Sequence, residues 1–315
     1  MSFARTVKNE LITIPVNHNE MLAEFSAFLN FSCDFHIEEG VKMLDFMTKN
    51  PAITKRFLLL TKSLYQADTI LLTKDQQKFT KKPLIILRVI KNVEAIIKEH
   101  DYLIDPIKKI EELTIDHANK VAFLRAAFLT SGSVNDPKTA EYHLEIFVNK
   151  KEEVVLIQSI MNYFNFNARV TKRRNGFICY LKDAETISDF IQLVGAYNSV
   201  FKFEDVRIKR DFNNSINRLI NCEIANERKS VEASDKQMKY INILRKHEFY
   251  LEIDSKLLKV MDLREKYVDI SLTDLVKLYK EEYNEEISRS GLNHRFNKIK
   301  ALAESISAKG EQKWL

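Results

Sequence analysis

Cysteine, glycine and proline are scarce in this chain of 315 residues, which has 3 Cys, 6 Gly and 5 Pro. The cysteines, Cys33, Cys179 and Cys222, are odd in number and far apart, which argues against a disulfide framework and favours a cytosolic protein. The longest apolar runs, such as Leu84–Leu87, end well before the roughly 18 residues that a membrane-spanning helix needs. We therefore expect a cytoplasmic protein that does not enter a membrane.

Several signatures of catalysis are also missing. No G-x-x-x-x-G-K or G-x-G-x-x-G stretch offers a loop for binding phosphates, and no serine lies in a G-x-S-x-G turn. The 7 histidines show no metal-ligand spacing. His36 lies near Cys33 and Asp34, but we interpret it as a structural residue. These absences predict a protein without a cofactor, a metal ion or an enzymatic active site.

What the chain does contain is one helix pattern written twice, at Phe25–Cys33 and Leu124–Gly132. Ala27 and Ala126 occupy matching places in the two copies. Small side chains inside an apolar helix allow two backbones to approach closely, as a helix pair at a pseudo-two-fold axis requires. The repeat therefore predicts one domain with two similar halves.

The segments after each helix also follow one order. We predict an α+β fold of two α-β-α-β-β-α repeats, at about 20–103 and 117–198, within a domain of residues 1–212. Asp45 alternates with apolar neighbours in the first strand of copy one, and Glu145 does so in copy two. This alternation is typical of a sheet with one face under helices. We therefore expect Asp45 and Glu145 on open sheet faces rather than as paired catalytic carboxylates.

The pattern changes after about position 197. Residues 213–252 look like a polar helical connector, residues 253–306 like three helices at about 255–266, 272–279 and 289–306, and residues 307–315 like a tail. Ser271, followed by Asp274, has the pattern of a helix N-cap. The third helix has an apolar stripe of Leu292, Phe296, Ile299 and Ala303. This arrangement is typical of a helix-turn-helix unit.

The third helix has no acidic residue from Ser288 to Leu302. Its polar residues include Arg289, Asn293, His294, Arg295, Lys298 and Lys300. Arg can contact guanine, and Asn adenine, through two hydrogen bonds each, so this helix is a candidate reader of the major groove. The alternative is a three-helix bundle with a solvated face, although such a face would mix both signs of charge.

The net charge of the whole chain is only +5. Such a small excess of positive charge indicates a function only if the basic side chains are clustered. A second cluster contains Arg207, Lys209, Arg210 and Arg218 among several asparagines. Phosphate contacts need such a mixture of positive charges and amide donors. The cations could equally pair with acids of the repeat domain. Lys172–Arg174 forms a basic tip beside a predicted hairpin turn. This tip could contact DNA, or it could simply be exposed to solvent.

Together these features resemble the LAGLIDADG homing-endonuclease fold with an appended helix-turn-helix, and the whole chain is similar to the bacterial WhiA family. The resemblance is carried by Leu124–Pro137, Tyr142–Ile146, Phe203–Ile208, Asn214–Asn226 and Ser288–Arg295. It extends from about Met21 to Ile306 and is looser in copy one, where Cys33 replaces the usual glycine.

Homing endonucleases carry a carboxylate at the eighth position of each helix motif, where it binds the divalent ions used for cleavage. The corresponding residues here are Ser32 and Ser131. Because a neutral hydroxyl cannot replace an anionic metal ligand, the resemblance implies a non-cleaving protein. Asp34 and Asp136 lie nearby, but at unequal distances past the two serines, so they are not symmetric substitutes.

The resemblance implies a sequence-specific DNA-binding regulator of transcription, linked to cell division and chromosome segregation. It assigns base reading to Arg289, Asn293, His294 and Arg295, phosphate contacts to Lys298 and Lys300, and supporting contacts to Arg207, Lys209, Arg210 and Arg218. The expected partner is double-stranded DNA, in a nucleoid-associated setting, with other regulatory or division proteins as further candidates. Since the repeat supplies two-fold symmetry within one chain, we expect a monomer.

Two alternative functions remain open. One is an active endonuclease whose acids have moved, with Asp34 and Asp136 as the displaced ligands. The other is a scaffold that binds a protein or a small molecule through the open sheet faces that carry Asp45 and Glu145.

Overall fold

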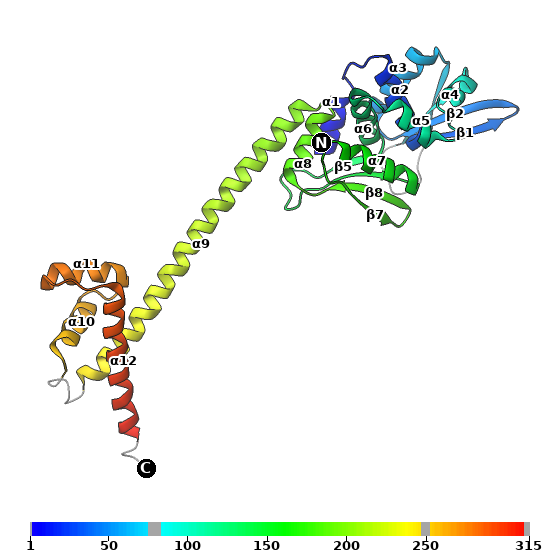
Figure 1. Ribbon diagram of the computed structural model, residues 1–315. Helices are drawn as coiled ribbons and strands as arrows, with labels where there is room; N and C mark the ends of the chain where they lie inside the picture. The colour runs from blue at the N-terminus through cyan, green and yellow to red at the C-terminus, as the bar shows by residue number, and fades with distance from the viewer. Residues whose placement is uncertain (1, 75–82, 247–252, 312–315) are drawn as a thin grey trace. The chain divides into compact units, whose positions relative to one another are not determined.

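The computed structural model describes residues 2–74, 83–246 and 253–311. The chain divides into two compact units, Met1–Asp211 (unit 1) and Phe212–Leu315 (unit 2). Figure 1 labels most of their helices and strands. Each unit has its own buried apolar core, so each is described by itself.

The two copies of the repeated helix form the centre of unit 1. They are α2 (His18–Ser32) and α6 (His117–Ser131), which pack directly against each other (Figure 1). Ala27 and Ala126 are fully buried, as expected for small residues at a close helix crossing. α2 starts at a capping box in which the Asn17 side chain accepts a hydrogen bond from the Glu20 backbone N at 3.0 Å.

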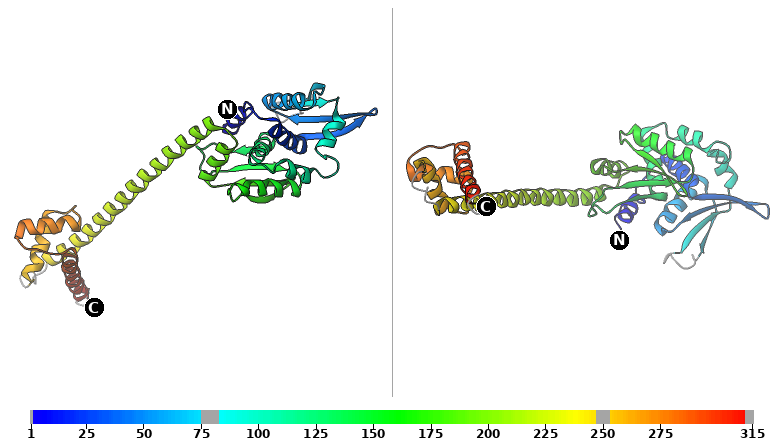
Figure 2. Two further views of the ribbon diagram at one scale, coloured as in Figure 1. Left: turned by 45° about the horizontal axis from the view of Figure 1, so that its top comes forward. Right: turned by 90° about the horizontal axis from the view of Figure 1, so that it is seen from below.

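Each repeat adds an antiparallel four-stranded sheet to this helix pair. The first contains β1 (Cys33–Glu38), β2 (Val41–Thr48), β3 (Thr69–Lys74) and β4 (Leu84–Val89), in the order β1-β2-β4-β3. The second contains β5 (Gly132–Val134), β6 (Leu144–Val148), β7 (Arg169–Arg173) and β8 (Gly176–Leu181), in the order β5-β6-β8-β7. The equal strand orders confirm the predicted α+β fold with two similar halves, whose strands lie on different sides of the helix pair (Figure 2).

The remaining helices of unit 1 surround this framework. They are α1 (Phe3–Leu11), α3 (Pro51–Tyr65), α4 (Val93–Glu99), α5 (Pro106–Leu113), α7 (Lys151–Tyr163) and α8 (Ala184–Leu193). α3 and α7 are the middle helices of the two repeats, and α4 and α8 end them.

Each repeat has one strand more than the order α-β-α-β-β-α predicted from the sequence. β1 and β5 begin at the residue after α2 and α6 end, so the observed order is α-β-β-α-β-β-α. The prediction missed them because no turn residues separate the helices from these strands. In addition, β5 has only 3 residues, too few to show the alternation of a strand.

Asp45 and Glu145 lie on the strand faces opposite the core, but the description of these faces as open needs correction. Asp45 is only 8% exposed, because the Arg88 guanidinium on β4 covers it with hydrogen bonds of 2.8 and 2.9 Å. Glu145 accepts from His143 at 2.9 Å and from Arg173 at 3.3 Å. Both carboxylates are thus paired with an arginine of the same sheet.

A buried ionic network joins α2, α3 and α6. The fully buried Glu24 carboxylate accepts hydrogen bonds of 3.0 and 2.8 Å from Arg56, and its other oxygen accepts one of 2.8 Å from Arg125. Arg56 also donates to the Ile14 carbonyl, and Arg125 to the Val194 carbonyl, at 2.8 Å each. One acid is therefore shared by two arginines and connects both halves of unit 1.

His100 closes the core of the first repeat. Its Nε2 lies 2.8 Å from the Tyr65 hydroxyl, its ring lies 5.3 Å from the Phe25 ring, and only 1% of it is exposed. Burial, together with the charge of Lys109, lowers the pKa of His100 to about 4. The folded protein therefore holds a neutral imidazole at pH values where the unfolded chain binds a proton.

This difference predicts a pH dependence of stability. As pH falls from about 6.5 to about 4, proton uptake by His100 in the unfolded chain removes up to about 3 kcal/mol of stability. The variant His100→Gln, which does not titrate there, should lose correspondingly less over the same interval. Urea unfolding followed by circular dichroism at pH 7 and pH 4.5 measures this. Equal losses in both proteins would contradict it.

Helix α9 (Tyr197–Arg245) runs without a break for 49 residues (Figure 2). Its first turns belong to unit 1, where Phe203 is buried between Phe3 and Tyr142 at ring distances of 5.9 and 5.5 Å. The rest belongs to unit 2. The connector predicted from the sequence is thus part of a longer helix.

Unit 2 contains the end of α9 and the helices α10 (Ser255–Lys266), α11 (Leu272–Tyr283) and α12 (Arg289–Glu311). Ile241 and Leu244 of α9 are buried in its core beside residues of all three helices. The core therefore includes residues that precede position 253. α11 starts as predicted, because the Ser271 hydroxyl accepts a hydrogen bond from the Asp274 backbone N.

Candidate nucleic-acid interface

Local geometry fixes where α12 begins. α11 ends at Asn284, whose φ of 51° is left-handed and turns the chain sharply. The Ser288 hydroxyl then accepts a hydrogen bond of 3.0 Å from the Gly291 backbone N at the start of α12. Helices α11 and α12 with this turn have the form of a helix-turn-helix.

α12 has one buried and one exposed face. Leu292, Phe296, Ile299 and Ala303 are at most 4% exposed, which confirms the predicted apolar stripe. The exposed polar residues of the helix include Arg289, Asn293, His294, Asn297, Lys298 and Lys300. At about 100° per residue, Arg289, Asn293, Asn297 and Lys300 fall on one side of the helix. The structure thus brings most of the predicted α12 residues onto solvent-accessible surface.

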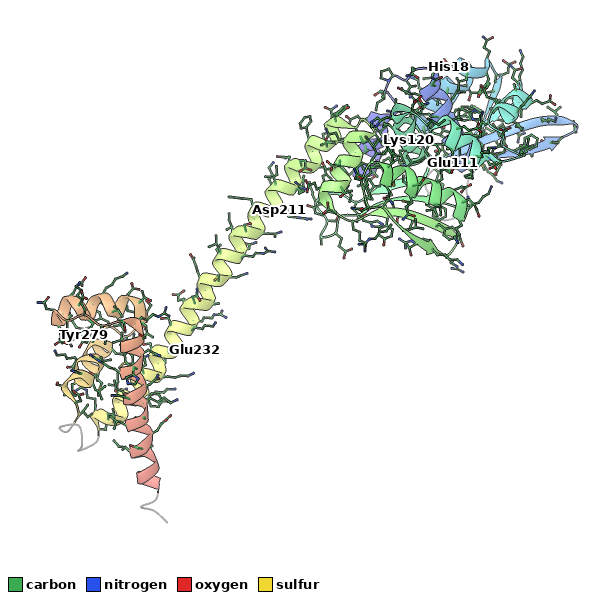
Figure 3. All side chains as sticks on the ribbon, in the orientation of Figure 1. His18, Glu111, Lys120, Asp211, Glu232 and Tyr279 are labelled. Carbon is green, nitrogen blue, oxygen red and sulfur yellow. The ribbon has the colours of Figure 1, made fainter. Side chains whose placement is uncertain are left out.

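Arg295 differs from the other predicted readers of α12. Its guanidinium donates a hydrogen bond of 2.8 Å to the Tyr279 hydroxyl and lies 5.3 Å from the centre of that ring. The Tyr279 hydroxyl in turn donates to Glu285 at 3.1 Å, and Lys259 donates to the same carboxylate at 2.7 Å. Tyr279 lies on α11 (Figure 3). Arg295 therefore connects α12 to α11 and, through Glu285, to Lys259 of α10, and its role as a base reader stays a prediction.

The turn before α12 carries two acids, but lysines neutralise both. Lys259 lowers the pKa of Glu285 through a hydrogen bond, and Lys280, at 2.6 Å, lowers that of Glu286. In the described part of the chain, no carboxylate pairs with Arg289, His294 or Lys298, whereas Lys300 lies 3.7 Å from Glu304. The start of α12 therefore presents uncompensated cations.

Sequence patterns gave no indication of Arg264, which supports this unit from inside. Its side chain is 1% exposed, yet it donates hydrogen bonds to the carbonyls of Tyr267, Val268 and Ile270 and to the Gln237 side chain. Burial lowers the pKa of Arg264 to about 10, so it stays charged at neutral pH. Arg264 fixes the loop between α10 and α11.

The basic stretch on α9 is largely occupied by contacts within the protein. Arg207 pairs with Glu204 at 2.9 Å, and Lys209 pairs with Asp205 at 2.8 Å, both on α9 itself. Arg210 donates a hydrogen bond of 2.7 Å to the Thr139 carbonyl and covers the Tyr142 ring. Arg218 is exposed. The pairing partners are thus mostly acids of the same helix.

The basic tip at Lys172–Arg174 lies at the end of β7, next to the turn into β8. Arg173 contacts Glu145 at 3.3 Å, whereas Lys172 and Arg174 are exposed. The tip therefore remains on the surface of unit 1.

The ends of α2 and α6 do not fit a pair of divalent ions. Ser32 and Ser131 end these helices, and the Ser131 hydroxyl is buried without a hydrogen-bond partner among the described residues. Asp34 is an exposed residue of β1, and the Asp136 carboxylate accepts a hydrogen bond of 3.0 Å from the Lys138 backbone N. Neutral hydroxyls are poor ligands for Mg²⁺, which prefers carboxylates.

Within residues 2–74, 83–246 and 253–311, none of the helices is both long and apolar enough to cross a membrane. Nor do three or more His, Cys, Asp or Glu side chains in these ranges come together as a metal site.

Three protein-family models match the chain. They are described as WhiA N-terminal LAGLIDADG-like domain, matching residues 18–102, WhiA LAGLIDADG-like domain, matching residues 120–213, and WhiA C-terminal HTH domain, matching residues 216–303. The first two correspond to the repeats of unit 1 and the third to the helices of unit 2.

Similar proteins from several bacteria are called probable cell division protein WhiA. The protein of Enterococcus faecalis is 38% identical over 312 residues, covering 98% of this chain and 99% of the relative. That of Lactiplantibacillus plantarum is 39% identical over 310 residues, covering 97% and 99%. The crystal structure of full-length DUF199/WhiA from Thermatoga maritima has the same fold, with a TM-score of 0.60 at 22% identity, over 97% of this chain and 99% of that one.

Proposed function

Because the chain belongs to the WhiA family, we propose that it is a regulator that binds double-stranded DNA through α12 and acts in bacterial cell division. The proposal includes a link to transcription and chromosome segregation. Unit 1 is then a LAGLIDADG-like body that does not cleave DNA.

The exposed face of α12 is the observation that carries this proposal. It combines arginine, asparagine, histidine and lysine, and the acids nearest to its start are held by lysines of α10 and α11. A helix-turn-helix places the first turns of its second helix against base edges. An uncompensated positive face also attracts the phosphate backbone and makes binding dependent on salt.

The positions of the side chains suggest how the roles divide. Arg289, Asn293 and His294 lie in the first two turns of α12, where base edges would be reached. Lys298 and Lys300 lie further along the helix and would contact phosphates. Arg295 would act indirectly, by holding α12 on Tyr279.

The supporting contacts of the proposal are Arg218 of unit 2 and Lys172 and Arg174 of unit 1, with Arg207, Lys209 and Arg210 of unit 1 as weaker candidates. The last three are already engaged by Glu204, Asp205 and Thr139, so contacting DNA would require them to give up these interactions.

One gel experiment tests DNA binding and the lack of cleavage together. Supercoiled plasmid incubated with the protein and Mg²⁺ or Mn²⁺ should be retarded on a native gel. It should be recovered uncut after digestion of the protein with protease, because hydroxyls at Ser32 and Ser131 cannot hold the ions that cleavage needs. Metal-dependent cuts that disappear in Asp34→Asn or Asp136→Asn would overturn the non-cleaving assignment. A plasmid that is not retarded at low salt would overturn DNA binding.

A further inference from the structure

A cavity of about 580 Å³ lies in unit 1. It is lined by α1, by the end of β2 and the start of α3, by the first residue of β4, and by Thr130 near the end of α6. Its volume is within the usual range for pockets that hold small organic molecules.

Three cations line this cavity. They are Arg5 and Lys8 of α1 and Lys49, which follows β2. The described part of the lining includes no carboxylate, and none of the three side chains forms an ion pair within the described ranges. The Lys8 ammonium lies over the Phe128 ring, 5.6 Å from its centre. Positive charge therefore gathers here without a carboxylate from the described part of the lining.

Such an arrangement is costly for the protein on its own. Burial lowers the pKa of Lys8 to about 8, which shows that its surroundings disfavour the charged ammonium. An anion entering the cavity would offset this penalty, since the Lys8 ammonium would gain a partner in a site partly shielded from water.

The rest of the lining is suited to an organic group rather than to a bare ion. Met47, Ile53 and Leu84 supply apolar surface, and Ile53 is only 2% exposed. Thr130 and Asn50 add neutral polar groups, although the Asn50 side chain already caps α3 by accepting from the Ala52 backbone N. A ligand with one anionic and one apolar end would match both parts of the wall.

We propose that this cavity binds a small phosphorylated organic molecule of about nucleotide size. Its phosphate groups contact the three cations, and its organic part lies on the apolar wall. Binding there would make the LAGLIDADG-like body a sensor of a small molecule. The proposal is independent of DNA binding by α12.

Isothermal titration of the full chain with ATP, glucose 6-phosphate, pyrophosphate and adenosine tests it. At least one of the organic phosphates should bind, more tightly than pyrophosphate, and adenosine should not bind measurably. Lys8→Met keeps an unbranched side chain of similar size but removes the charge, so it should weaken binding by about 10-fold or more. Lys98→Met, at an exposed position on α4, is the matched control and should bind as the wild type does.

Arg5→Gln and Lys49→Gln provide independent variants, and circular dichroism checks that each one is folded. Failure of all the phosphates to bind at millimolar concentration would overturn the proposal, as would unchanged binding in the three folded variants. A third result would also overturn the proposal. If a DNA duplex displaces the bound phosphate probe, and Lys8→Met weakens duplex binding as much as it weakens binding of the probe, the cavity is a contact for DNA phosphates.

Discussion

Replacing Glu24 with glutamine is expected to lower the free energy of unfolding of unit 1 by about 3–5 kcal/mol, the range for breaking a buried ion pair. Glutamine has nearly the same shape, so packing between α2 and α6 is kept. Its neutral amide, however, leaves Arg56 and Arg125 charged and buried without a counter-ion. Their hydrogen bonds to the carbonyls of Ile14 and Val194 would remain but cannot neutralise them.

A loss of this size is a large part of the about 5–15 kcal/mol that stabilises an ordinary domain. Urea unfolding of the full chain, followed by circular dichroism and by hydrogen exchange of amides in α2 and α6, measures it. Glu111→Gln, an exposed position on α5 (Figure 3), is the matched control and should change stability by less than about 0.5 kcal/mol. If the two variants unfold at the same urea concentration, the ionic network does not hold the repeats together.

The double variant Arg289→Ala/Asn293→Ala is expected to lose roughly 100-fold in affinity for the preferred duplex, because each two-pronged base contact contributes about 1–3 kcal/mol of discrimination. Affinity for unrelated duplexes should fall much less, since Lys298 and Lys300 still contribute to non-specific binding. The ratio between the two affinities therefore shrinks.

The preferred duplex is first selected by the wild type from random sequences, and fluorescence anisotropy then gives both affinities at one salt concentration. Asn226→Ala/Arg228→Ala removes the same two side-chain types from exposed positions on α9 and should leave the ratio unchanged. An unchanged ratio in the α12 variant would show that this helix does not read the sequence.

The repeated architecture could be predicted from the sequence because it depends on local patterns. Local patterns of this kind are the duplicated helix around Ala27 and Ala126, the helix cap at Ser271 and the apolar stripe from Leu292 to Ala303. Each depends on residue spacings that the geometry of the helix backbone sets. β1 and β5 were not predicted, because no turn residues mark a strand that continues directly from a helix. Their existence depends on pairing with β2 and β6, which is a tertiary contact.

The electrostatic contacts of the site were beyond sequence reasoning for a related reason. The sequence around a basic residue does not show whether its side chain faces solvent or contacts a residue far away in the chain. Arg295 lies on a helix rich in exposed cations, yet it faces Tyr279, 16 positions away in the chain. Arg264 and Glu24 likewise read as ordinary surface residues of amphipathic helices. Only the packing of separate helices shows that both are buried.

Photo-crosslinking from α12 tests the central claim most directly. A benzophenone side chain placed at position 297, which is exposed beside Asn293, should crosslink to the preferred duplex on irradiation, and the duplex should remain full length in the presence of Mg²⁺. The same group at position 281, an exposed site on α11, serves as the comparison. The account predicts strong labelling from 297 and little from 281. Labelling confined to unit 1, for example from position 172 on β7 with none from 297, would contradict it.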